Sequence, residues 1–432
     1  MGARPQAQDS AQHLAEIAWS FHHAVDPAQA VRRNLSIAAG ELRVADHRLP
    51  VADSARIYLA AIGKAAPGMA QAAAEVLGAR LTQGVVTVPR GLSPSPLGRL
   101  TYVPAGHPLP DEGSLAAGLT LERMLQDMHP EDLLLALISG GGSAMLEIPA
   151  DGVRLDHLRV VNDLLLRSGA TVQEINTVRQ SLSSVKGGGL AAMAAPAKTV
   201  GLLISDVVGD HPEAIASGLT VRCACRRASA RDVVEHYRLE PLFPREVIRV
   251  LHTPSPAQRF PPPLNVLVAT NRLGLEAAAQ AAARLGFAVQ RFPEPMQGET
   301  HQVARAFALA LRRAKPPGCL LLGGETTIEV QGPGRGGRNQ SFALAAALEL
   351  RDAPRTLLAA IASDGVDGPT DAAGAVVDGQ TIALLLAQGM EAQANIRRRD
   401  AYPALQAAGA LIHSGPSGTN VGDFVIGLRY AE

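Results

Sequence analysis

Residues 133–143 read Leu-Leu-Leu-Ala-Leu-Ile-Ser-Gly-Gly-Gly-Ser, an apolar run that passes directly into three successive glycines. Six apolar residues in a row predict a strand that is buried on both faces. Glycines allow positive φ angles, so that several backbone N–H groups can turn toward one point. We therefore expect the loop to bind a phosphate or a carboxylate, whereas a plain tight turn is the alternative. The loop consists of Ser139, Gly140, Gly141, Gly142 and Ser143.

The same pattern, a buried strand that ends in a loop rich in Gly, Asp and Ser, recurs along the chain. In open α/β sheets, ligands bind just beyond the carboxyl ends of the strands. Five such loops therefore predict one composite site at a sheet edge. The other four strands are expected at residues 57–62, 200–204, 319–322 and 357–361.

Helical patterns alternate with these strands, as the connections between parallel strands require. The predicted fold class is α/β, with two Rossmann-like α/β/α domains, built on mostly parallel sheets, flanking an active-site cleft. Five prolines among residues 253–263 favour a stiff connector. We expect an N-terminal domain at 1–253 with a helical lead-in at 10–40, a Pro-rich linker at 254–263 and a C-terminal α/β domain at 264–432.

Composition restricts the partners of this protein. Lys plus Arg and Asp plus Glu each number 40, and aromatic residues make up 3% of the 432 residues. Balanced charge and few aromatic rings disfavour nucleic acid and membrane surfaces as partners. No leader pattern or membrane-length apolar run is found, so we expect a cytoplasmic protein that binds small molecules, with a homodimer as one possible assembly. The three cysteines predict neither a disulfide framework nor a zinc site.

Basic residues stand where an anion could be held. Lys64 lies in a tight loop directly after the first predicted strand, where a lysine can reach a phosphate as a point charge. Arg338 and Asn339 begin a predicted helix, whose N–H groups and dipole favour an anion. Arg179 and Lys186 are seven residues apart, a spacing that can place both on one helix face. A solvated basic surface is the alternative for this last pair.

Carboxylates also gather after the predicted strands. Mg²⁺ is held by one or two carboxylates together with substrate phosphates, so this set suits a metal–nucleotide site. The candidate metal ligands are Asp206, Asp364 and Asp367, and Glu325 is a candidate for binding substrate or phosphate. An aspartate here could also accept the proton of a substrate hydroxyl. Some of these residues are expected to be turn or cap residues instead.

A G-x-G-x-x-G sequence occurs at residues 332–337, before a predicted helix. In a dinucleotide fold, an acidic residue after the second strand binds the ribose. Asp352 has the right spacing from the first glycine, but it precedes the next predicted strand instead of following it. The motif therefore does not fit an NAD site. Neither a Walker sequence nor the protein-kinase motifs occur, so phosphoryl transfer would need another apparatus.

Taken in order, the motifs resemble those of the class II glycerate kinases (glycerate 2-kinases, the MOFRL family). The resemblance runs over nearly the whole chain, and many ordered motifs are far more specific than one loop. His211 and Leu219 depart from the family pattern, in which an aspartate and a proline are expected. The matching segments are residues 61–66, 106–112, 138–144, 176–190, 204–220, 323–340, 363–374 and 414–420.

The resemblance implies two α/β domains and transfer of the γ-phosphate of ATP to the 2-hydroxyl of D-glycerate, with Mg²⁺. It also implies that Lys64 and Arg338 are the principal cationic residues, and Asp206 is the best candidate to serve Mg²⁺ or to accept the hydroxyl proton. The loop at 139–143 would hold phosphates, and Arg338 with Arg179 would bind the substrate carboxylate.

Two other functions remain open at the level of sequence. One is an NAD(P)H-dependent hydroxypyruvate reductase, and the other is a non-catalytic protein that binds small anions. The residues alone do not decide between a 2-phosphoglycerate and a 3-phosphoglycerate product, nor which aspartates hold metal.

Overall fold

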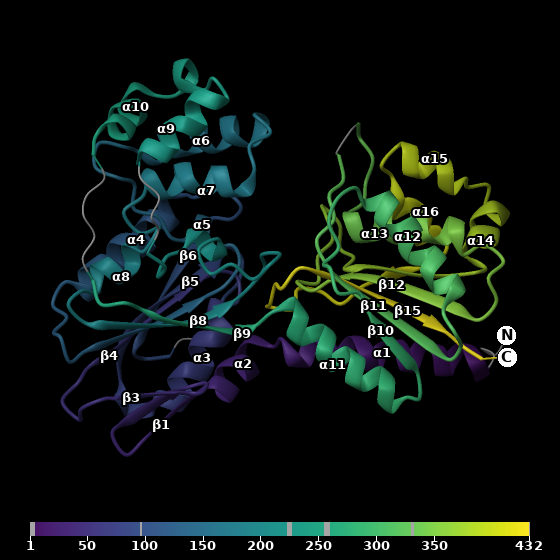
Figure 1. Cartoon of the computed structure of the whole chain (residues 1–432), viewed down its shortest axis with the longest axis horizontal. Helices are drawn as coiled ribbons and strands as arrows, with labels where there is room; N and C mark the ends of the chain where they lie inside the picture. Colours follow the sequence, from purple (N-terminus) through teal and green to yellow (C-terminus); the bar gives the residue numbers. More distant parts are fainter. Residues whose placement is uncertain (1–4, 96, 223–226, 255–259, 330–331, 432) are drawn as a thin grey trace. The chain divides into compact units, whose positions relative to one another are not determined.

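A computed structural model describes residues 5–95, 97–222, 227–254, 260–329 and 332–431. The chain divides into two compact units. We call Pro27–Val268 the N-terminal unit, and we call Met1–Asp26 together with Ala269–Glu432 the C-terminal unit. Both combine a six-stranded sheet with helices, which confirms the α/β class (Figure 1). Cys223 and Cys225, and residues 255–259 of the expected linker at 254–263, lie outside the described residues.

The N-terminal unit contains the strand at 133–138 in the middle of its sheet. The strand order is β6 (Leu100–Ala105), β5 (Leu81–Pro89), β4 (Ile57–Ile62), β7 (Leu133–Ile138), β8 (Lys198–Ile204) and β9 (Leu264–Ala269). The pairings from β6 to β8 are parallel. Every residue of β4 and β7 is buried, as the apolar runs predict. Because Ile62 pairs with Ile138, the loops after both strands emerge at the same edge.

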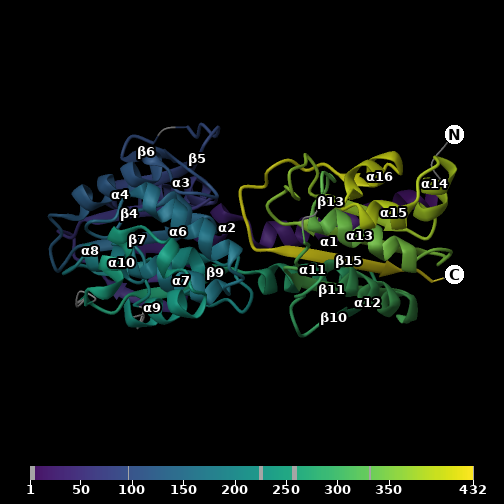
Figure 2. The ribbon, with the colours of Figure 1, turned by 90° about the horizontal axis from the view of Figure 1, so that it is seen from above.

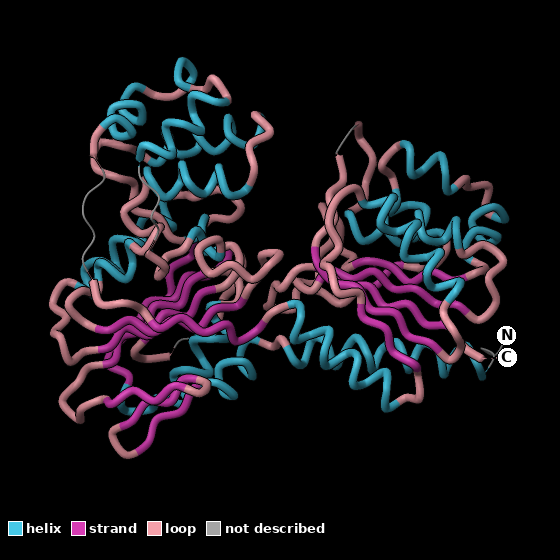
Figure 3. Tube along the Cα trace, in the orientation of Figure 1, coloured by secondary structure: helices cyan, strands magenta, loops and turns pink. Residues whose placement is uncertain are grey.

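The helices of the N-terminal unit form two groups. One group covers the sheet, and the second is a small helical cluster with its own apolar core, made by α6, α7, α9 and α10 (Figure 3). A three-stranded antiparallel sheet, β1-β2-β3, completes the unit. The elements other than the large sheet are α2 (Pro27–Asn34), β1 (Leu35–Ala38), β2 (Glu41–Val44), β3 (His47–Pro50), α3 (Ala66–Leu77), α4 (Glu112–Leu125), α5 (Gly142–Met145), α6 (Leu155–Arg167), α7 (Val172–Ser181), α8 (Gly189–Met193), α9 (Arg227–His236) and α10 (Arg245–His252).

The sheet of the C-terminal unit is mixed. Its order is β10 (Ala288–Arg291), β11 (Gly318–Gly324), β15 (Asp423–Arg429), β12 (Thr356–Ala362), β13 (Gly374–Asp378) and β14 (Leu411–Ile412). β10 and β11 are parallel, but β15 lies between β11 and β12 and runs antiparallel to both. Figure 2 shows β15 as a yellow arrow. The first residue of β15, Asp423, therefore pairs with Gly324 and Ala362 at the carboxyl ends of its neighbours.

Helices cover both faces of this second sheet. α1 and α11 lie on one face, and α12 and α13 pack together on the other (Figures 1 and 3). The apolar core is built largely of alanine and leucine from α12, α13 and the sheet. The helices are α1 (Pro5–Ala24), α11 (Asn271–Arg284), α12 (Thr300–Arg313), α13 (Arg338–Glu349), α14 (Thr381–Ala387), α15 (Ala392–Arg397) and α16 (Ala401–Ala407).

Two segments do not belong to the domain in which the sequence placed them, when the N-terminal domain was expected to end at 253 and the C-terminal domain to begin at 264. The lead-in helix α1 is part of the C-terminal unit, because the ring of Phe21 stacks on Phe424 with centroids 3.8 Å apart and both side chains are fully buried. Residues 35–38 of the lead-in form a strand instead of a helix. β9, expected to open the C-terminal domain, is instead the last strand of the N-terminal sheet.

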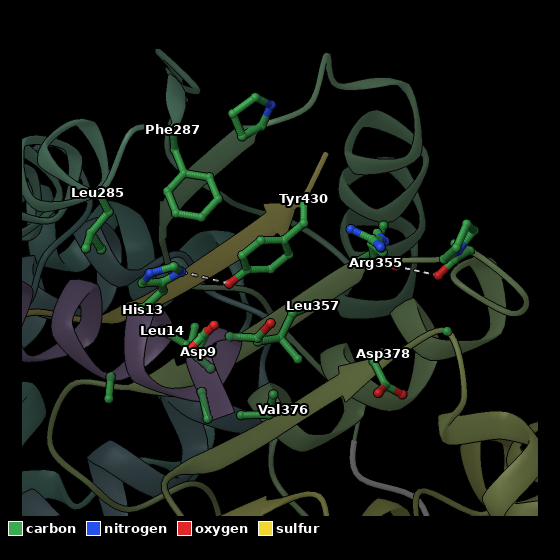
Figure 4. Close-up of a pocket in the computed structure, with 18 of the residues that line it drawn as sticks. Asp9, His13, Leu14, Leu285, Phe287, Arg355, Leu357, Val376, Asp378 and Tyr430 are labelled. Carbon is green, nitrogen blue, oxygen red and sulfur yellow. Dashed lines mark hydrogen bonds between the residues drawn. The ribbon is translucent and has the colours of Figure 1, made fainter. Parts of the chain in front are cut away.

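A groove with a cavity of about 1260 Å³ lies beside α1 in the C-terminal unit. The side chains of Phe287, Tyr430 and His13 form one wall, and the Tyr430 hydroxyl lies 3.5 Å from Nδ1 of His13 (Figure 4). Leu357 and Val376 line the opposite side. None of the loops predicted to bind the substrate lines this groove. Within the described residues, no helix has both the length and the apolar character needed to span a membrane.

Candidate active site

The glycine loop after β7 brings Lys64 and Asp206 close to its own backbone. A Cβ added at Gly140 would lie 2.1 Å from Oδ2 of Asp206, and one added at Gly141 would lie 3.1 Å from Cγ of Lys64. Gly141 also has a φ of 82°, which favours glycine. The two glycines therefore allow the side chains of Lys64 and Asp206 to lie directly against the backbone of the loop. His107, missed in the sequence, belongs to the same group, since its Cδ2 would lie 3.0 Å from the added Cβ at Gly141.

Ser139 joins the two loops instead of facing a ligand. It is buried, its Oγ accepts a hydrogen bond from the backbone N–H of Ala65 at 3.0 Å, and the hydroxyl lies 3.4 Å from the carbonyl oxygen of Ile62. The N–H of Lys64 donates to the carbonyl of Gly140 at 2.9 Å. These bonds fix the position of Lys64 relative to the glycine loop. The phosphate contact expected of Ser139 is thus replaced by a positioning role.

The far end of the glycine loop is held by a chain of polar side chains. Oγ of Ser143 lies 2.8 Å from Oγ of Ser217, which in turn donates to Oδ1 of Asn176 at 2.9 Å. Ser217 has a φ of 58° and is buried. The N–H of Gly142 is bonded back to Ser139 at 3.2 Å, so Gly142 does not offer this group to a ligand. Asn176 and Ser217 were not predicted, because only the loop's fold brings these distant segments together.

Lys186 is engaged with a carboxylate of the protein. It is buried and forms an ion pair with Glu147, whose Oε1 also accepts from the Ser183 hydroxyl at 2.5 Å. Burial lowers the pKa of Lys186, and attraction to Glu147 partly offsets this. The prediction that Lys186 binds phosphate is therefore not supported by its contacts. Glu147 itself could not have been found from the sequence, since it lies outside the strand-end pattern.

Arg179 lies beside this pair but is more accessible. Its Nε donates to Oδ1 of Asn162 at 2.7 Å, and burial lowers the pKa of Arg179. A small cavity of about 10 Å³ is lined by Arg179, Lys186, Glu147 and Ser143, together with apolar side chains. Arg179 and Lys186 thus both line this cavity, but they do not share a helix face as their spacing predicts, because α7 ends at Ser181.

In the C-terminal unit, Arg338 lies between two carboxylates. Its Nη1 bonds to Glu325, its Nε bonds to Asp423, and its Nη2 donates to Oδ1 of Asp423 at 3.3 Å. Burial alone lowers the pKa of Arg338, but attraction to both carboxylates outweighs this, and the net pKa is raised. Burial raises the pKa of Asp423 to about 7, against the opposing effect of Arg338. Glu325 and Arg338 were predicted, whereas Asp423 was not.

The N-terminus of α13 does bind an anion, but the anion belongs to the protein. Oδ1 of Asp367 accepts from the backbone N–H and the side chain of Asn339 at 3.1 and 3.2 Å, and Oδ2 accepts from the N–H of Gln340 at 2.8 Å. Burial raises the pKa of Asp367, and the two backbone bonds counter it. Asn339 is thus corrected from a phosphate ligand to a partner of Asp367. Both oxygens of Asp367 cap the helix, and its predicted role as a metal ligand stays a prediction.

The remaining metal candidates do not form a cluster. Oδ1 of Asp364 accepts from the N–H of Val366 at 3.1 Å, which is a local turn. Asp364 and Asp206 belong to different units. Among the residues that the structure describes, no group of three or more His, Cys, Asp or Glu side chains could hold a metal ion. A single carboxylate beside substrate phosphates is the arrangement that these residues fit.

The G-x-G-x-x-G segment has no room for a pyrophosphate. A Cβ at Gly337 would lie 2.2–2.4 Å from the carboxylate atoms of Asp367, so the helix start that a dinucleotide needs is already filled. Residues 330 and 331, which directly precede the motif, lie outside the described residues. The exclusion of an NAD fingerprint here thus has a physical cause.

Comparisons with known proteins agree with the motifs. A family model described as a domain of unknown function (DUF4147) matches residues 13–252, and the MOFRL family model matches residues 318–423. The chain is 37% identical to the D-glycerate 2-kinase of Thermotoga maritima, over 89% of this chain and 94% of that protein. It is 35% identical to a human glycerate kinase, over 93% and 89% of the two chains.

Further relatives carry two kinds of name. A protein of Agrobacterium vitis named putative hydroxypyruvate reductase is 36% identical, over 92% of this chain and 94% of that one. The crystal structure of glycerate kinase from Thermotoga maritima superposes with a TM-score of 0.87 at 35% identity, covering 98% of this chain and all of that one. The family expected from the ordered motifs is therefore confirmed, and the chain belongs to the MOFRL family of glycerate 2-kinases.

Proposed function

We propose that this protein is an ATP-dependent kinase that phosphorylates the 2-hydroxyl of D-glycerate. The hydroxyl oxygen forms a bond to the γ-phosphorus of ATP, the bond to the bridging oxygen breaks, ADP leaves, and the hydroxyl proton passes to a base. The products are 2-phosphoglycerate and ADP. Membership of the glycerate 2-kinase family supports this reaction.

The observation that carries the proposal is the meeting of Lys64, Asp206 and the glycine loop at one sheet edge. Phosphoryl transfer needs positioning and charge stabilisation more than covalent chemistry. Lys64 supplies a positive charge beside a backbone segment that has no side chains at Gly140 and Gly141. The oxygens of a phosphate can approach such a segment closely.

Asp206 and Arg179 complete the proposed roles in the N-terminal unit. Asp206 accepts the proton of the substrate hydroxyl or holds the metal ion that travels with ATP. Arg179 binds the substrate carboxylate, since Lys186 is already paired with Glu147. In the C-terminal unit, Arg338 is the proposed second cationic residue of catalysis.

Mg²⁺ is the expected metal, and its fit rests on the oxygen donors present. Asp206 is a carboxylate beside the bare loop backbone, which suits a cation that keeps water and phosphate oxygens as its other ligands. When bound, the ion would neutralise charge on the phosphates. Neither Asp364 nor Asp367 is needed for this fit.

The test is an assay of ATP turnover with D-glycerate and Mg²⁺, analysed by ³¹P NMR. Phosphorus on the 2-oxygen couples to one carbon-bound proton, and on the 3-oxygen to two, so that the splitting identifies the product. ADP formation with a doublet is expected. A triplet would overturn the choice of hydroxyl, and glycerate binding without turnover would overturn the kinase function.

The reductase name of some relatives defines a second candidate. It predicts that NADH absorbance falls when hydroxypyruvate is added in the absence of ATP. We expect no such fall, because the α13 N-terminus is filled by Asp367. Oxidation of NADH at a rate comparable with that of the kinase assay would favour the reductase.

A further inference from the structure

Asp423 reaches the edge of the C-terminal sheet because β15 runs against its neighbours. Its backbone pairs with Gly324 on one side and Ala362 on the other. Its carbonyl oxygen also accepts from Nδ2 of Asn271 at 2.9 Å. The backbone that carries this carboxylate is therefore fixed from three sides.

The carboxylate of Asp423 binds Arg338 through two nitrogens of the guanidinium. Nε bonds to Oδ2, and Nη2 donates to Oδ1 at 3.3 Å, while Nη1 bonds to Glu325. A guanidinium has five N–H groups in a planar fork. These contacts engage one N–H on each nitrogen and set the plane of the group, so the second N–H of each terminal nitrogen points in a defined direction.

We propose that Asp423 is a positioning residue, which acts by holding the guanidinium of Arg338 in the orientation that phosphoryl transfer requires. The inference rests on the proposed kinase function, in which Arg338 is a cationic catalytic residue. The side chain of Asp423 is only 2% exposed, so it acts on substrate through Arg338.

A buried carboxylate is a costly way to fill space. Removing a charged group from water is unfavourable unless a partner compensates, and an apolar residue of similar volume often stabilises a fold as well or better. Arginine has many rotamers, and two bonds to one rigid carboxylate remove most of that freedom. A lysine at 338 would keep the charge but not the fork. The pairing with Asp423 thus fixes the orientation of the Arg338 guanidinium, in addition to balancing its charge.

The experiment is a double-mutant cycle on the full chain, with kcat/KM measured for D-glycerate and expressed per folded molecule. Asp423→Asn keeps the shape of the side chain and is expected to lower kcat/KM about 10²-fold, the cost of a misplaced catalytic group. In the Arg338→Ala background, the same change is expected to alter kcat/KM less than about threefold, because it acts through the missing guanidinium. The proposal would be overturned if the two kcat/KM losses multiplied in the double variant. Wild-type activity of Asp423→Asn would also overturn it.

The matched control is Asp132→Asn. Asp132 is also buried and also bonded to an arginine, Arg56, through two nitrogens, but it precedes β7 at the opposite end of the strand from the glycine loop. Its replacement is expected to lower stability and leave kcat/KM unchanged. If Asp423→Asn fails to fold, Arg338→Lys replaces it, with an expected loss of similar size; wild-type turnover by Arg338→Lys would contradict the need for orientation.

A second readout does not depend on activity. In protein carrying ¹⁵N-arginine, the Nε–H signal of Arg338 is expected to exchange slowly with water and to exchange at least tenfold faster in Asp423→Asn. Fast exchange in the wild-type protein would overturn the positioning role. If the wild-type protein shows no kinase activity while this signal is protected, the proposed function fails and the orientation of Arg338 by Asp423 stands.

Discussion

The two sheet edges described here hold their cationic residues in different ways. In the N-terminal unit, parallel strands end together, and Lys64 is placed by backbone bonds and by Ser139. In the C-terminal unit, an antiparallel strand enters between two others, and Arg338 is placed by the carboxylates of Asp423 and Glu325. The first edge thus relies on glycines and backbone geometry, and the second relies on paired charges. Mutations should affect them differently.

The largest effect is expected for Lys64→Ala at the first edge. Loss of one charge aimed at the phosphates should lower kcat on the order of 10³-fold. The circular dichroism spectrum should be unchanged, because Lys64 is held through its backbone. The control is Lys198→Ala, which removes an exposed lysine at the start of β8. Turnover of Lys64→Ala close to the wild-type value would remove this residue from the catalytic site.

Lys186→Met tests whether Lys186 is a structural residue or a phosphate ligand. The change leaves Glu147 buried without its partner, which should lower the free energy of unfolding by about 3–5 kcal/mol in urea denaturation. Adding Glu147→Leu should recover most of this loss, because a buried ion pair is often replaceable by apolar residues. The double variant should still turn over D-glycerate. A stable but inactive double variant would instead support the original expectation that Lys186 binds phosphate.

Gly140→Ala tests whether the first edge depends on bare backbone. The added methyl group would lie 2.1 Å from the Asp206 carboxylate and must displace it, so kcat/KM should fall about 10²-fold. Gly68→Ala in α3 is the control, since its methyl group would meet nothing closer than 3.8 Å. That variant should be slightly more stable and fully active. Equal activity of the two variants would show that Asp206 does not need its present position.

Asp367→Ala tests the helix cap at the second edge. Removing the carboxylate leaves the N–H groups of Asn339 and Gln340 without an acceptor and should lower the unfolding free energy by about 1–2 kcal/mol. Asp367→Asn keeps one acceptor and should lose less. If Asp367 were instead a metal ligand, the loss would appear in the dependence of activity on Mg²⁺ concentration, and stability would hardly change.

The smallest perturbation is a change of pH around Asp423. Its carboxyl ¹³C signal should titrate with a midpoint of about 7, because burial raises its pKa to that value. The folded state then binds this proton more tightly than the unfolded chain, whose aspartates titrate near 3.9. The stability contributed by this group is therefore complete below about pH 4 and is lost as the pH rises through 7. A midpoint below 4 would show that Arg338 outweighs burial.

The sequence was most informative where local patterns decide structure. The apolar runs before Gly63, Ser139 and Ser205 predicted buried parallel strands, and the parallel register then brings the following loops together. The helix expected to begin at Arg338 and Asn339 is likewise present, because α13 begins at Arg338. In such segments, the local sequence pattern predicts both the strand and the turn that follows it.

It was least informative where distant segments meet. Asp423 is the first residue of its strand, so a search for polar residues after strands does not find it. It lies at this edge only because β15 runs antiparallel to its neighbours. The anion site at Asn339 was recognised, but nothing local says that Asp367 fills it. Lys186 and Glu147 are also 39 residues apart. Such pairings depend on tertiary structure, and a single sequence does not display them.

The position of β15 in the sheet also affects the order in which the two units fold during synthesis. The N-terminal unit is one continuous segment, and its strands are all synthesised before residue 270. The C-terminal unit begins with α1, but its sheet has β15 in an interior position, and that strand ends at Arg429. Because domains fold as their segments leave the ribosome, the N-terminal unit can be folded before β15, on which α1 packs, has been synthesised. A nascent chain stopped before residue 423 should therefore hold a folded first unit and an open, chaperone-dependent second one.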